Sequence, residues 1–244
     1  MPDKLRIAML ISGGGTTMQA IIRACKNGAL KDKVEPVLVI ASRAEAGGLQ
    51  KACDEGIPNH NVLLIARTDY PDPLDFGEAI LMACQKRRVD FIGQYGWMVK
   101  TPANVIEAYQ NMMVNQHPGP LDPGKPDFGG KGMFGHRVHC ARLYFVRKVK
   151  RDFTTEAVAQ RIALEYDQGA VLRKRVIPIQ KDDDPISLQE RVLPEEHLVQ
   201  IETLEDFADG NVIEITRRTP LVFSGEEKVL AEAKKIAKML FPKG

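Results

Sequence analysis

The sequence lacks the features that mark several other classes of protein. Its 244 residues include a single tryptophan and only 6% aromatics, and 34 Lys and Arg nearly balance 32 Asp and Glu. Because nucleic-acid-binding domains usually carry a clear basic excess, this balance argues against a nucleic-acid partner. The apolar runs reach only about five residues, whereas a membrane-spanning helix needs about 20. We therefore expect neither nucleic acid nor a membrane as a partner.

Cysteine is equally scarce. Cys25, Cys53, Cys84 and Cys140 form no CxxC pair and show no spacing typical of a zinc site. This pattern predicts reduced, mostly buried thiols and no bound metal. The apolar run at the N-terminus is too short for a signal peptide. We therefore expect a cytoplasmic protein.

The overall composition, with 44% hydrophobic and 27% charged residues, is typical of a soluble globular protein. The first 118 residues alternate short apolar runs with helix-like stretches, which is typical of βαβ units. The expected strands are 5–11, 37–41, 61–66, 89–95 and 112–117, and the expected helices cover 16–28, 44–55, 73–87 and 102–109. Since these strands are almost wholly apolar, we predict an α/β fold with a Rossmann-like, mostly parallel sheet and helices on both faces.

The second half of the sequence is less regular. Residues 119–135 are rich in Pro and Gly, which predicts an ordered loop over a site. Beyond it we expect a helix at 135–150, strands at 175–179 and near 212–216, a long helix at 188–203, and a terminal helix that begins at a capping box over 224–227. We predict one domain over 1–244, with a phosphate-binding half at 5–118 and the remaining elements at 119–244.

Two clusters contain residue types that bind metals. His136, His139 and Cys140 lie close together but lack a fourth ligand, so we interpret them as structural. The acidic run 182–184 precedes Pro185 and is interpreted as a solvated turn before a helix.

The first candidate site is the loop 12–17, with the sequence SGGGTT, between the first strand and the first helix. Backbone N–H groups at a helix N-terminus bind anions, and glycines allow a phosphate to approach closely. The loop is not a Walker loop, because no GK[ST] follows, and Met18 breaks the GxGxxG pattern. We favour a phosphate site, and a tight turn without a ligand remains the alternative.

The second candidate site combines a strand end with a distant turn. Asn115 and His117 are two residues apart on the expected fifth strand, so both project to the same face. An amide beside an imidazole can stabilise an oxyanion and move a proton. Asp167, beside Gly169, could orient or charge this imidazole. A lone structural histidine and a turn aspartate remain the alternatives.

These pieces, in this order, resemble the glycinamide ribonucleotide formyltransferases of purine biosynthesis, which use 10-formyltetrahydrofolate as co-substrate. The matching stretches are ISGGGTTMQAII, VIASRAEAGGLQKACDEGIP, VDFIGQYGWMVKTPANVI, VNQHPGPL, YDQGAVL and the Glu196-His197 pair before FADGNV. The resemblance covers roughly 5–213 and implies the formyltransferase fold. It also implies a folate-dependent enzyme acting on a small phosphorylated amine, and a homodimer is left open.

The resemblance also assigns residues to roles. It implies a catalytic set of Asn115, His117 and Asp167. For the phosphorylated substrate it implies a phosphate loop of Gly14, Gly15, Thr16 and Thr17, with Glu196 at the glycinamide end. For the folate pocket it implies Met98, Val99, Lys100, Thr101, Tyr166 and Gln168.

The chain departs from the family pattern at several substrate contacts. The usual serine after the HP dipeptide is Gly119, and the family's second histidine before the aspartate is Gln160. Other departures are Thr17, Leu193, the Val99-Lys100 pair and an insertion over 122–153. By its periodicity 155–163 is a helix, whereas the resemblance makes it a strand, which we favour.

These departures leave alternatives for the function. Formyl transfer to glycinamide ribonucleotide is the main hypothesis, because the three chemical residues are present. Water could replace the amine, which gives a formyltetrahydrofolate hydrolase, or another amine could be the acceptor. Outside enzymology, the chain could be a folate- or phosphate-ligand-binding protein that has lost catalysis.

Overall fold

The computed structural model describes residues 4–244. Its strands follow the order β3-β2-β1-β4-β5-β6-β7. The pairs from β3 to β5 are parallel, and β6 and β7 are antiparallel. This confirms the mostly parallel sheet expected from the sequence.

The chain divides into two compact units. Unit 1 comprises the described residues up to Asn115 together with Gln200–Val212, and unit 2 comprises Gln116–Val199 and Ile213–Gly244. The strand β5 and the long helix α6 each run from one unit into the other. Each unit is described by itself below.

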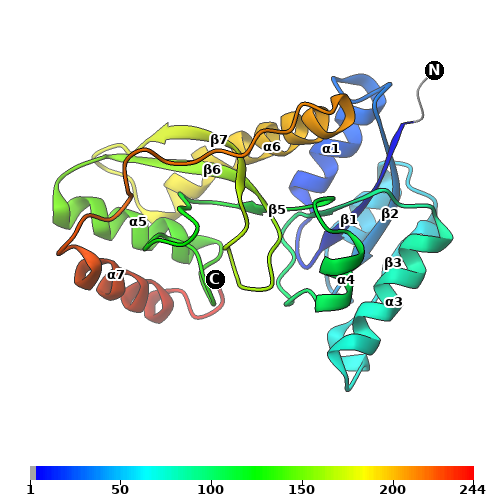
Figure 1. The fold of residues 1–244 in the computed structure, drawn as a ribbon, viewed down its shortest axis with the longest axis horizontal. Coiled ribbons are helices and arrows are strands. Elements are labelled where there is room, and N and C mark those ends of the chain that lie inside the picture. The colour runs from blue at the N-terminus through cyan, green and yellow to red at the C-terminus, as the bar shows by residue number, and fades with distance from the viewer. Residues whose placement is uncertain (1–3) are drawn as a thin grey trace. The chain divides into compact units, whose positions relative to one another are not determined.

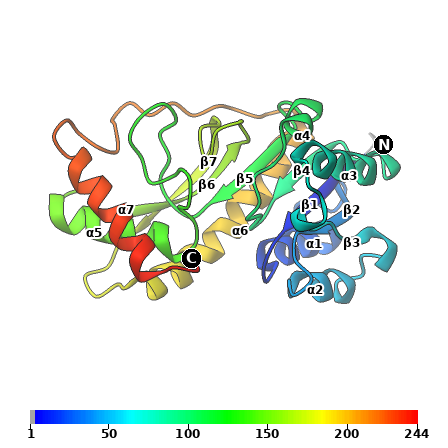
Figure 2. The ribbon, with the colours of Figure 1, turned by 90° about the horizontal axis from the view of Figure 1, so that it is seen from below.

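Unit 1 contains the parallel strands and the helices that connect them. The strands are β1 (Leu5–Ile11), β2 (Val34–Ala41), β3 (Val62–Leu64), β4 (Phe91–Gln94) and the start of β5 (Met113–His117). The helices are α1 (Thr16–Asn27), α2 (Gly48–Asp54), α3 (Pro73–Lys86) and α4 (Ala103–Ala108), with single turns η1 (Asn59–Asn61) and η2 (Arg67–Asp69). Figures 1 and 2 show α1 and α2 on one face of these strands and α3 and α4 on the other. Right-handed crossovers require this arrangement, because the strand order reverses direction after β3.

The core of unit 1 is the apolar sheet itself. Residues 7–11 of β1 and 38–41 of β2 are fully buried. On α1, Met18, Ile21 and Ile22 are buried at helical spacing. The helix ends as predicted at Gly28, whose N–H donates to the Ala24 carbonyl. In unit 1, the local sequence patterns therefore predict the helices and strands that form.

Unit 2 contains β6 (Thr154–Arg161), β7 (Val171–Pro178), α5 (His136–Val149), α7 (Glu227–Leu240) and the first part of α6 (Pro185–Asp209). The helices α5 and α7 lie side by side in both views (Figures 1 and 2). Phe128, Phe145 and Ala233 belong to the buried core that they share with the two strands. The loop 119–135 has no helix or strand, as predicted, and β6 confirms that the start of 155–163 is a strand.

Several predicted elements were wrong or misplaced. The expected strand near 212–216 is a single bridge between Ile215 and Val171. Its apolar pattern is misleading, because Ile213 is 71% exposed and has no sheet face to cover. The expected helix 44–55 begins only at Gly48, because residues 43–47 form turns.

The helix ends in unit 2 also differ from the prediction. Ser224 does not cap α7, which begins at Glu227, because the Glu226 side chain binds Arg151 and the Phe223 N–H instead. The long helix α6 begins at Pro185 rather than Leu188. Asp184 caps it, accepting from the N–H groups of residues 186 and 187.

The acidic run before α6 is only in part the solvated turn expected from the sequence, because Asp182 and Asp184 are exposed and Asp183 is not. Asp183 is buried and forms an ion pair with Arg191. This pairing lowers the pKa of Asp183.

Candidate active site

The glycine loop of unit 1 lies where β1 ends and α1 begins. Gly15 is the residue before α1, with φ of 65°, and no side chain caps the helix. The first N–H groups of a helix have no intrahelical acceptor and carry a partial positive charge. No acidic residue lies in the first turn. The loop 14–17 can therefore bind an anion, as the sequence predicts.

The loop has a rigid support that sequence reasoning missed. The Gly48 N–H, at the start of α2, donates to the Gly13 carbonyl at 3.1 Å. A Cβ on Gly15 would lie 2.8 Å from the Gly48 Cα, so both positions need glycine. Lys51 brings its Nζ to 4.0 Å from where a Cβ on Gly14 would lie. The sequence signal was the GGLQK run, which places a lysine one helical turn after the glycine pair.

The hydroxyls of this loop differ in their surroundings. Thr16 is exposed, whereas Thr17 is buried on α1. Ser12 is buried and its Oγ lies 2.6 Å from the Ser42 Oγ, so the two hydroxyls share a hydrogen bond. Ser12 also accepts a hydrogen bond from the Met98 N–H at 2.8 Å. It thereby ties the loop to the segment after β4.

That segment carries the four residues 98–101 predicted for the folate pocket. Met98 is 45% exposed, Val99 is half-buried and Lys100 is exposed. Thr101 is buried, and its hydroxyl accepts a hydrogen bond from Gln94. Met98 thus exposes an apolar surface, whereas the Thr101 hydroxyl is already hydrogen-bonded to Gln94 on β4.

The end of β5 carries Asn115 and His117. Both belong to one strand at alternate positions, so they project to one face. His117 is 2% exposed, and its Nδ1 lies 3.0 Å from the Gly119 carbonyl oxygen. Because a carbonyl only accepts, Nδ1 carries a proton. The buried Nε2 has no hydrogen-bond partner among the described residues and can exchange a proton with a ligand.

Asp167 lies beside this nitrogen, at 3.9 Å between its Oδ2 and the His117 Nε2. That distance suits an ion pair but is too long for a hydrogen bond. The ring of His117 is therefore oriented by the Gly119 carbonyl, while Asp167 supplies nearby negative charge.

The carboxylate of Asp167 is fixed by two donors. The Gly130 N–H donates to Oδ2 at 2.7 Å, and Gln160 Nε2 donates to Oδ1 at 2.7 Å. Donors to both oxygens fix the orientation of the carboxylate. Asp167 itself has φ of 57°, a conformation rare for residues other than glycine. The surrounding loop holds the residue in this strained position.

Two further carboxyls lie in the loop 119–135 and were not predicted. Asp127 is buried and accepts from the N–H groups of Asp122 and Gly129, both at 2.9 Å. Burial raises the pKa of Asp127, and the two backbone N–H donors oppose this rise. The Oδ2 of Asp122 is buried and has no hydrogen-bond partner among the described residues.

Glu196 has a partner that the sequence did not suggest. Its carboxyl is buried on α6, and its Oε2 accepts from Gln116 Nε2 at 2.5 Å. Burial raises the pKa of Glu196 to about 7. Gln116 is adjacent to His117 on β5, so its side chain projects to the opposite face. Within unit 2, Glu196 thus contacts the residue between the two proposed catalytic side chains.

The remaining predicted pocket residues flank Asp167. Tyr166 is 40% exposed, and burial and the nearby Asp167 charge raise its pKa. Gln168 is exposed and its Oε1 accepts from the Gly124 N–H at 2.9 Å. Gln168 therefore links the Asp167 turn to the loop 119–135.

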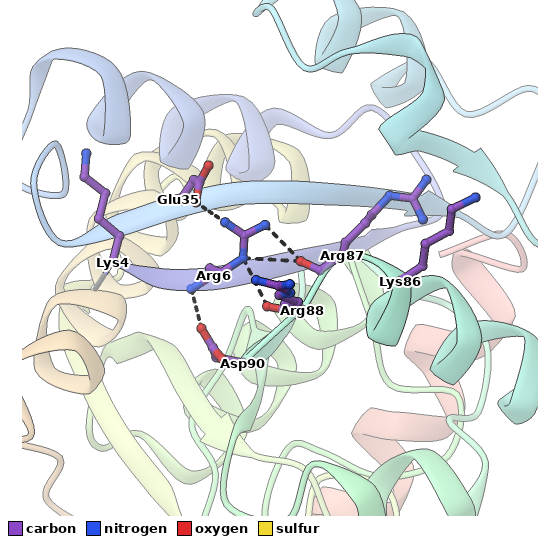
Figure 3. Close-up of a pocket in the computed structure, with 7 residues that line it drawn as sticks. All are labelled: Lys4, Arg6, Glu35, Lys86, Arg87, Arg88 and Asp90. Carbon is purple, nitrogen blue, oxygen red and sulfur yellow. Dashed lines mark hydrogen bonds and ion pairs between the residues drawn. The ribbon is translucent and has the colours of Figure 1, made fainter. Parts of the chain in front are cut away.

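A cavity of about 600 Å³ lies at the start of β1 in unit 1, and its lining includes none of the residues described above (Figure 3). Two of its cations, Arg6 and Arg87, are hydrogen-bonded within the fold. The Arg6 guanidinium donates to Glu35 and to the carbonyls of residues 87 and 88, and the Asp90 carboxylate accepts from the Arg6 N–H. We interpret the side chains around this cavity as structural, because their hydrogen bonds hold the starts of neighbouring strands together.

Within residues 4–244, no helix is both long and apolar enough to cross a membrane. No group of three or more His, Cys, Asp or Glu side chains in this part of the chain could hold a metal ion. The four thiols are free, and three are buried.

The sequence matches the formyl transferase family over residues 5–204. The chain belongs to this family. It is 31% identical over 225 residues to the chloroplastic phosphoribosylglycinamide formyltransferase of Vigna unguiculata, covering 91% of this chain and 66% of that protein. It is also 31% identical over 205 residues to the same-named Arabidopsis thaliana protein, covering 83% of this chain and 65% of that protein. The chain thus spans just under two thirds of these relatives' length.

The fold agrees with a solved structure of the same family. Glycinamide ribonucleotide transformylase 1 from Symbiobacterium toebii superposes with a TM-score of 0.75 at 26% identity, covering 89% of this chain and 96% of that chain. The predicted formyltransferase fold is therefore confirmed.

Two departures from the family pattern have a structural reason. A Cβ on Gly119 would lie 2.3 Å from the Val138 Cγ1, so a serine does not fit against this valine. Gln160 replaces a histidine and donates its amide N–H to Asp167. A neutral amide holds the carboxylate without adding a titrating group beside it.

Proposed function

We propose that this formyltransferase moves a formyl group from 10-formyltetrahydrofolate to the amine of glycinamide ribonucleotide. Family membership supports the reaction class, and the two plant relatives and the S. toebii structure bear the name of this activity. The observation that carries the proposal is the His117 Nε2, which is buried, has no hydrogen-bond partner within residues 4–244, and lies 3.9 Å from a carboxylate.

In the proposed reaction, the amine attacks the formyl carbon and forms a new C–N bond. The bond from this carbon to the folate nitrogen breaks, and a proton passes from the amine to that nitrogen. The Asn115 amide and protonated His117 would stabilise the oxyanion that forms in between. With Nδ1–H bound to Gly119, the Nε2 of His117 is the atom that can give or take a proton. Asp167 would hold its carboxylate beside the reacting imidazole, 3.9 Å from Nε2.

We further propose that Gly14, Gly15, Thr16 and Thr17 bind the phosphate, with Lys51 adding a cation beside them. An uncapped helix N-terminus and a nearby lysine both support an anion there. Met98 and Tyr166 each expose an apolar surface that suits a folate ring.

A single domain over 1–244, a homodimer and a cytoplasmic location also remain proposals. Sedimentation of the purified chain would measure its assembly, and a mass near 27.1 kDa would contradict the dimer.

One observation favours a second candidate, formyl transfer to a different phosphorylated amine. Glu196, which the resemblance assigns to the glycinamide end, is buried and bound to Gln116, and a leucine stands three residues before it. Polar contacts of this kind determine substrate choice strongly.

The experiment is turnover of 10-formyltetrahydrofolate by the purified chain, with and without glycinamide ribonucleotide. The proposal predicts turnover that requires the ribonucleotide. Turnover without it would indicate the hydrolase, and no turnover in either condition would leave a different amine or a binding protein. His117→Ala is the control for activity that comes from a contaminating enzyme.

A further inference from the structure

The terminal helix α7 lies beyond the residues that match the family, which end at 204. Its apolar face packs into the core of unit 2 through Leu230, Ala233 and Ala237, beside α5. Two lysines one turn apart, Lys234 and Lys238, extend from this helix to the loop 119–135. The helix therefore contacts the loop that holds Asp167.

Lys234 reaches the point of this loop nearest to Asp167. Its Nζ donates to the Gly129 carbonyl at 2.7 Å, and its side chain is half-buried. Burial lowers the pKa of Lys234, and the nearby carboxylates of Asp127 and Asp167 offset only part of this decrease. A half-buried lysine that keeps two carboxylates nearby is more than a solvated surface charge.

Gly129 and Gly130 transmit this contact to Asp167. The Gly129 N–H donates to Asp127 at 2.9 Å, and the Gly130 N–H donates to Asp167 at 2.7 Å. A Cβ on Gly129 would lie 2.6 Å from the Asp167 Cβ, so the backbone here touches the aspartate directly. Fixing the carbonyl of residue 129 also fixes the peptide plane that carries the N–H of residue 130.

We propose that Lys234 is a positioning residue for formyl transfer, which holds the Gly129–Gly130 peptide and through it the carboxylate of Asp167 beside His117. This inference rests on the proposed function. It adds to it a role for a helix outside the part of the chain that matches the family.

Lys238 provides a matched control. It lies one turn further along the same helix and also donates to a loop carbonyl, that of Lys131, at 3.0 Å. Lys238 is exposed, and its acceptor lies one residue beyond Gly130. If the lysines only attach the helix to the loop, then Lys234→Met and Lys238→Met should have similar effects.

The first readout needs no activity. Residue-resolved amide hydrogen exchange should show the Gly130 N–H exchanging about tenfold faster in Lys234→Met, because one partly buried, charge-assisted hydrogen bond is lost. Lys238→Met should leave this amide within about twofold of the wild type. An unchanged Gly130 amide in Lys234→Met would overturn the proposal.

The second readout is steady-state kinetics. Lys234→Met should lower kcat about tenfold with little change in KM for either substrate, since a displaced carboxylate weakens the transition state rather than binding. Lys234→Arg should recover most of this loss, because it keeps the cation and the donor. Equal losses in both methionine variants, or a change confined to KM, would overturn the positioning role.

The two readouts separate this inference from the proposed function. Absence of turnover in the wild type would overturn the proposed function and, with it, the role of Lys234 in that reaction. Normal wild-type turnover with an unaffected Lys234→Met enzyme would overturn only the role of Lys234.

Discussion

The glycine loop of unit 1 and the histidine cluster of unit 2 are built in different ways. The loop is formed within six consecutive residues and offers backbone N–H groups at a helix start. The cluster brings His117 together with Gln160 and Asp167, which lie 43 and 50 residues later in the sequence, and it is fixed by hydrogen bonds from backbone and side-chain groups. A site of the first kind can be predicted from a local motif, whereas one of the second kind depends on how distant segments meet. The following predictions test this difference, beginning with the largest expected effect.

Catalysis by the histidine cluster should depend most strongly on the His117 side chain. His117→Ala should lower kcat on the order of a thousandfold, because it removes both a proton carrier and an oxyanion donor. Turnover with both substrates is the measurement, and circular dichroism checks that the fold is retained. His60→Ala is the matched control, because His60 is exposed in unit 1. A loss of only a few-fold in His117→Ala would contradict the assignment.

The buried carboxyl of Glu196 should make the stability of the protein depend on pH. Its pKa is raised from 4.5 to about 7 in the folded state, so folding favours the protonated form. Stability should fall as pH rises between these values, by about 3 kcal/mol in total.

Glu196→Gln should remove this dependence, because the amide does not titrate but can still bind Gln116. The measurement is the free energy of unfolding in urea at pH 5 and pH 8 for both proteins. Glu195→Gln is the control, since this neighbour is partly exposed and pairs with Arg175. The same pH dependence in wild type and Glu196→Gln would contradict the account.

Ligand binding by the glycine loop should instead depend on the conformation of its backbone. Gly15→Ala places a Cβ 2.8 Å from the Gly48 Cα at a φ of 65°, which costs about 1–2 kcal/mol in the left-handed region. We expect KM for the ribonucleotide to rise about tenfold, with a smaller effect on the folate. Gly14→Ala is the control, because its Cβ would meet only the Lys51 Nζ at 4.0 Å. Equal effects of the two variants would show that backbone conformation does not determine binding.

The smallest effect is expected for the lysine beside the loop. Lys51→Met should weaken ribonucleotide binding about threefold, as for a partly solvated ion pair. The difference from the wild type should shrink in 1 M salt, where charges are screened within about 3 Å. Calorimetric titration at two salt concentrations measures both values. A difference that does not change with salt would place Lys51 outside the anion site.

The sequence predicted the parts that depend on local signals. The strand, glycine loop and helix of unit 1 follow each other within residues 5–28, and each begins or ends at a residue whose chemistry explains it. Gly28 ends α1 because a side chain at this position would crowd the backbone of Ala24. The Gly28 N–H donates to the Ala24 carbonyl. The alternation of apolar runs with helix-like stretches predicted the parallel strands of this half.

The parts that were missed depend on tertiary contacts. Glu226 binds Arg151, 75 residues earlier, so the expected capping box at Ser224 does not form. Glu196 binds Gln116, 80 residues away, although the resemblance assigned it to a substrate. The support of Asp167 by Gly130 and of Gly129 by Lys234 joins segments 37 and 105 residues apart. No pattern within a short window can show such pairs.

The central claim is that this formyltransferase passes a formyl group directly to a phosphorylated amine, and that His117 stabilises the oxyanion and moves the proton in this step. The most direct test follows the carbon of 10-[13C]formyltetrahydrofolate, incubated with glycinamide ribonucleotide and either the wild type or His117→Ala. The account predicts label in an amide of the ribonucleotide with the wild type, and on the order of a thousandfold slower labelling with the variant. Label released as formate at equal rates with and without the ribonucleotide would contradict it.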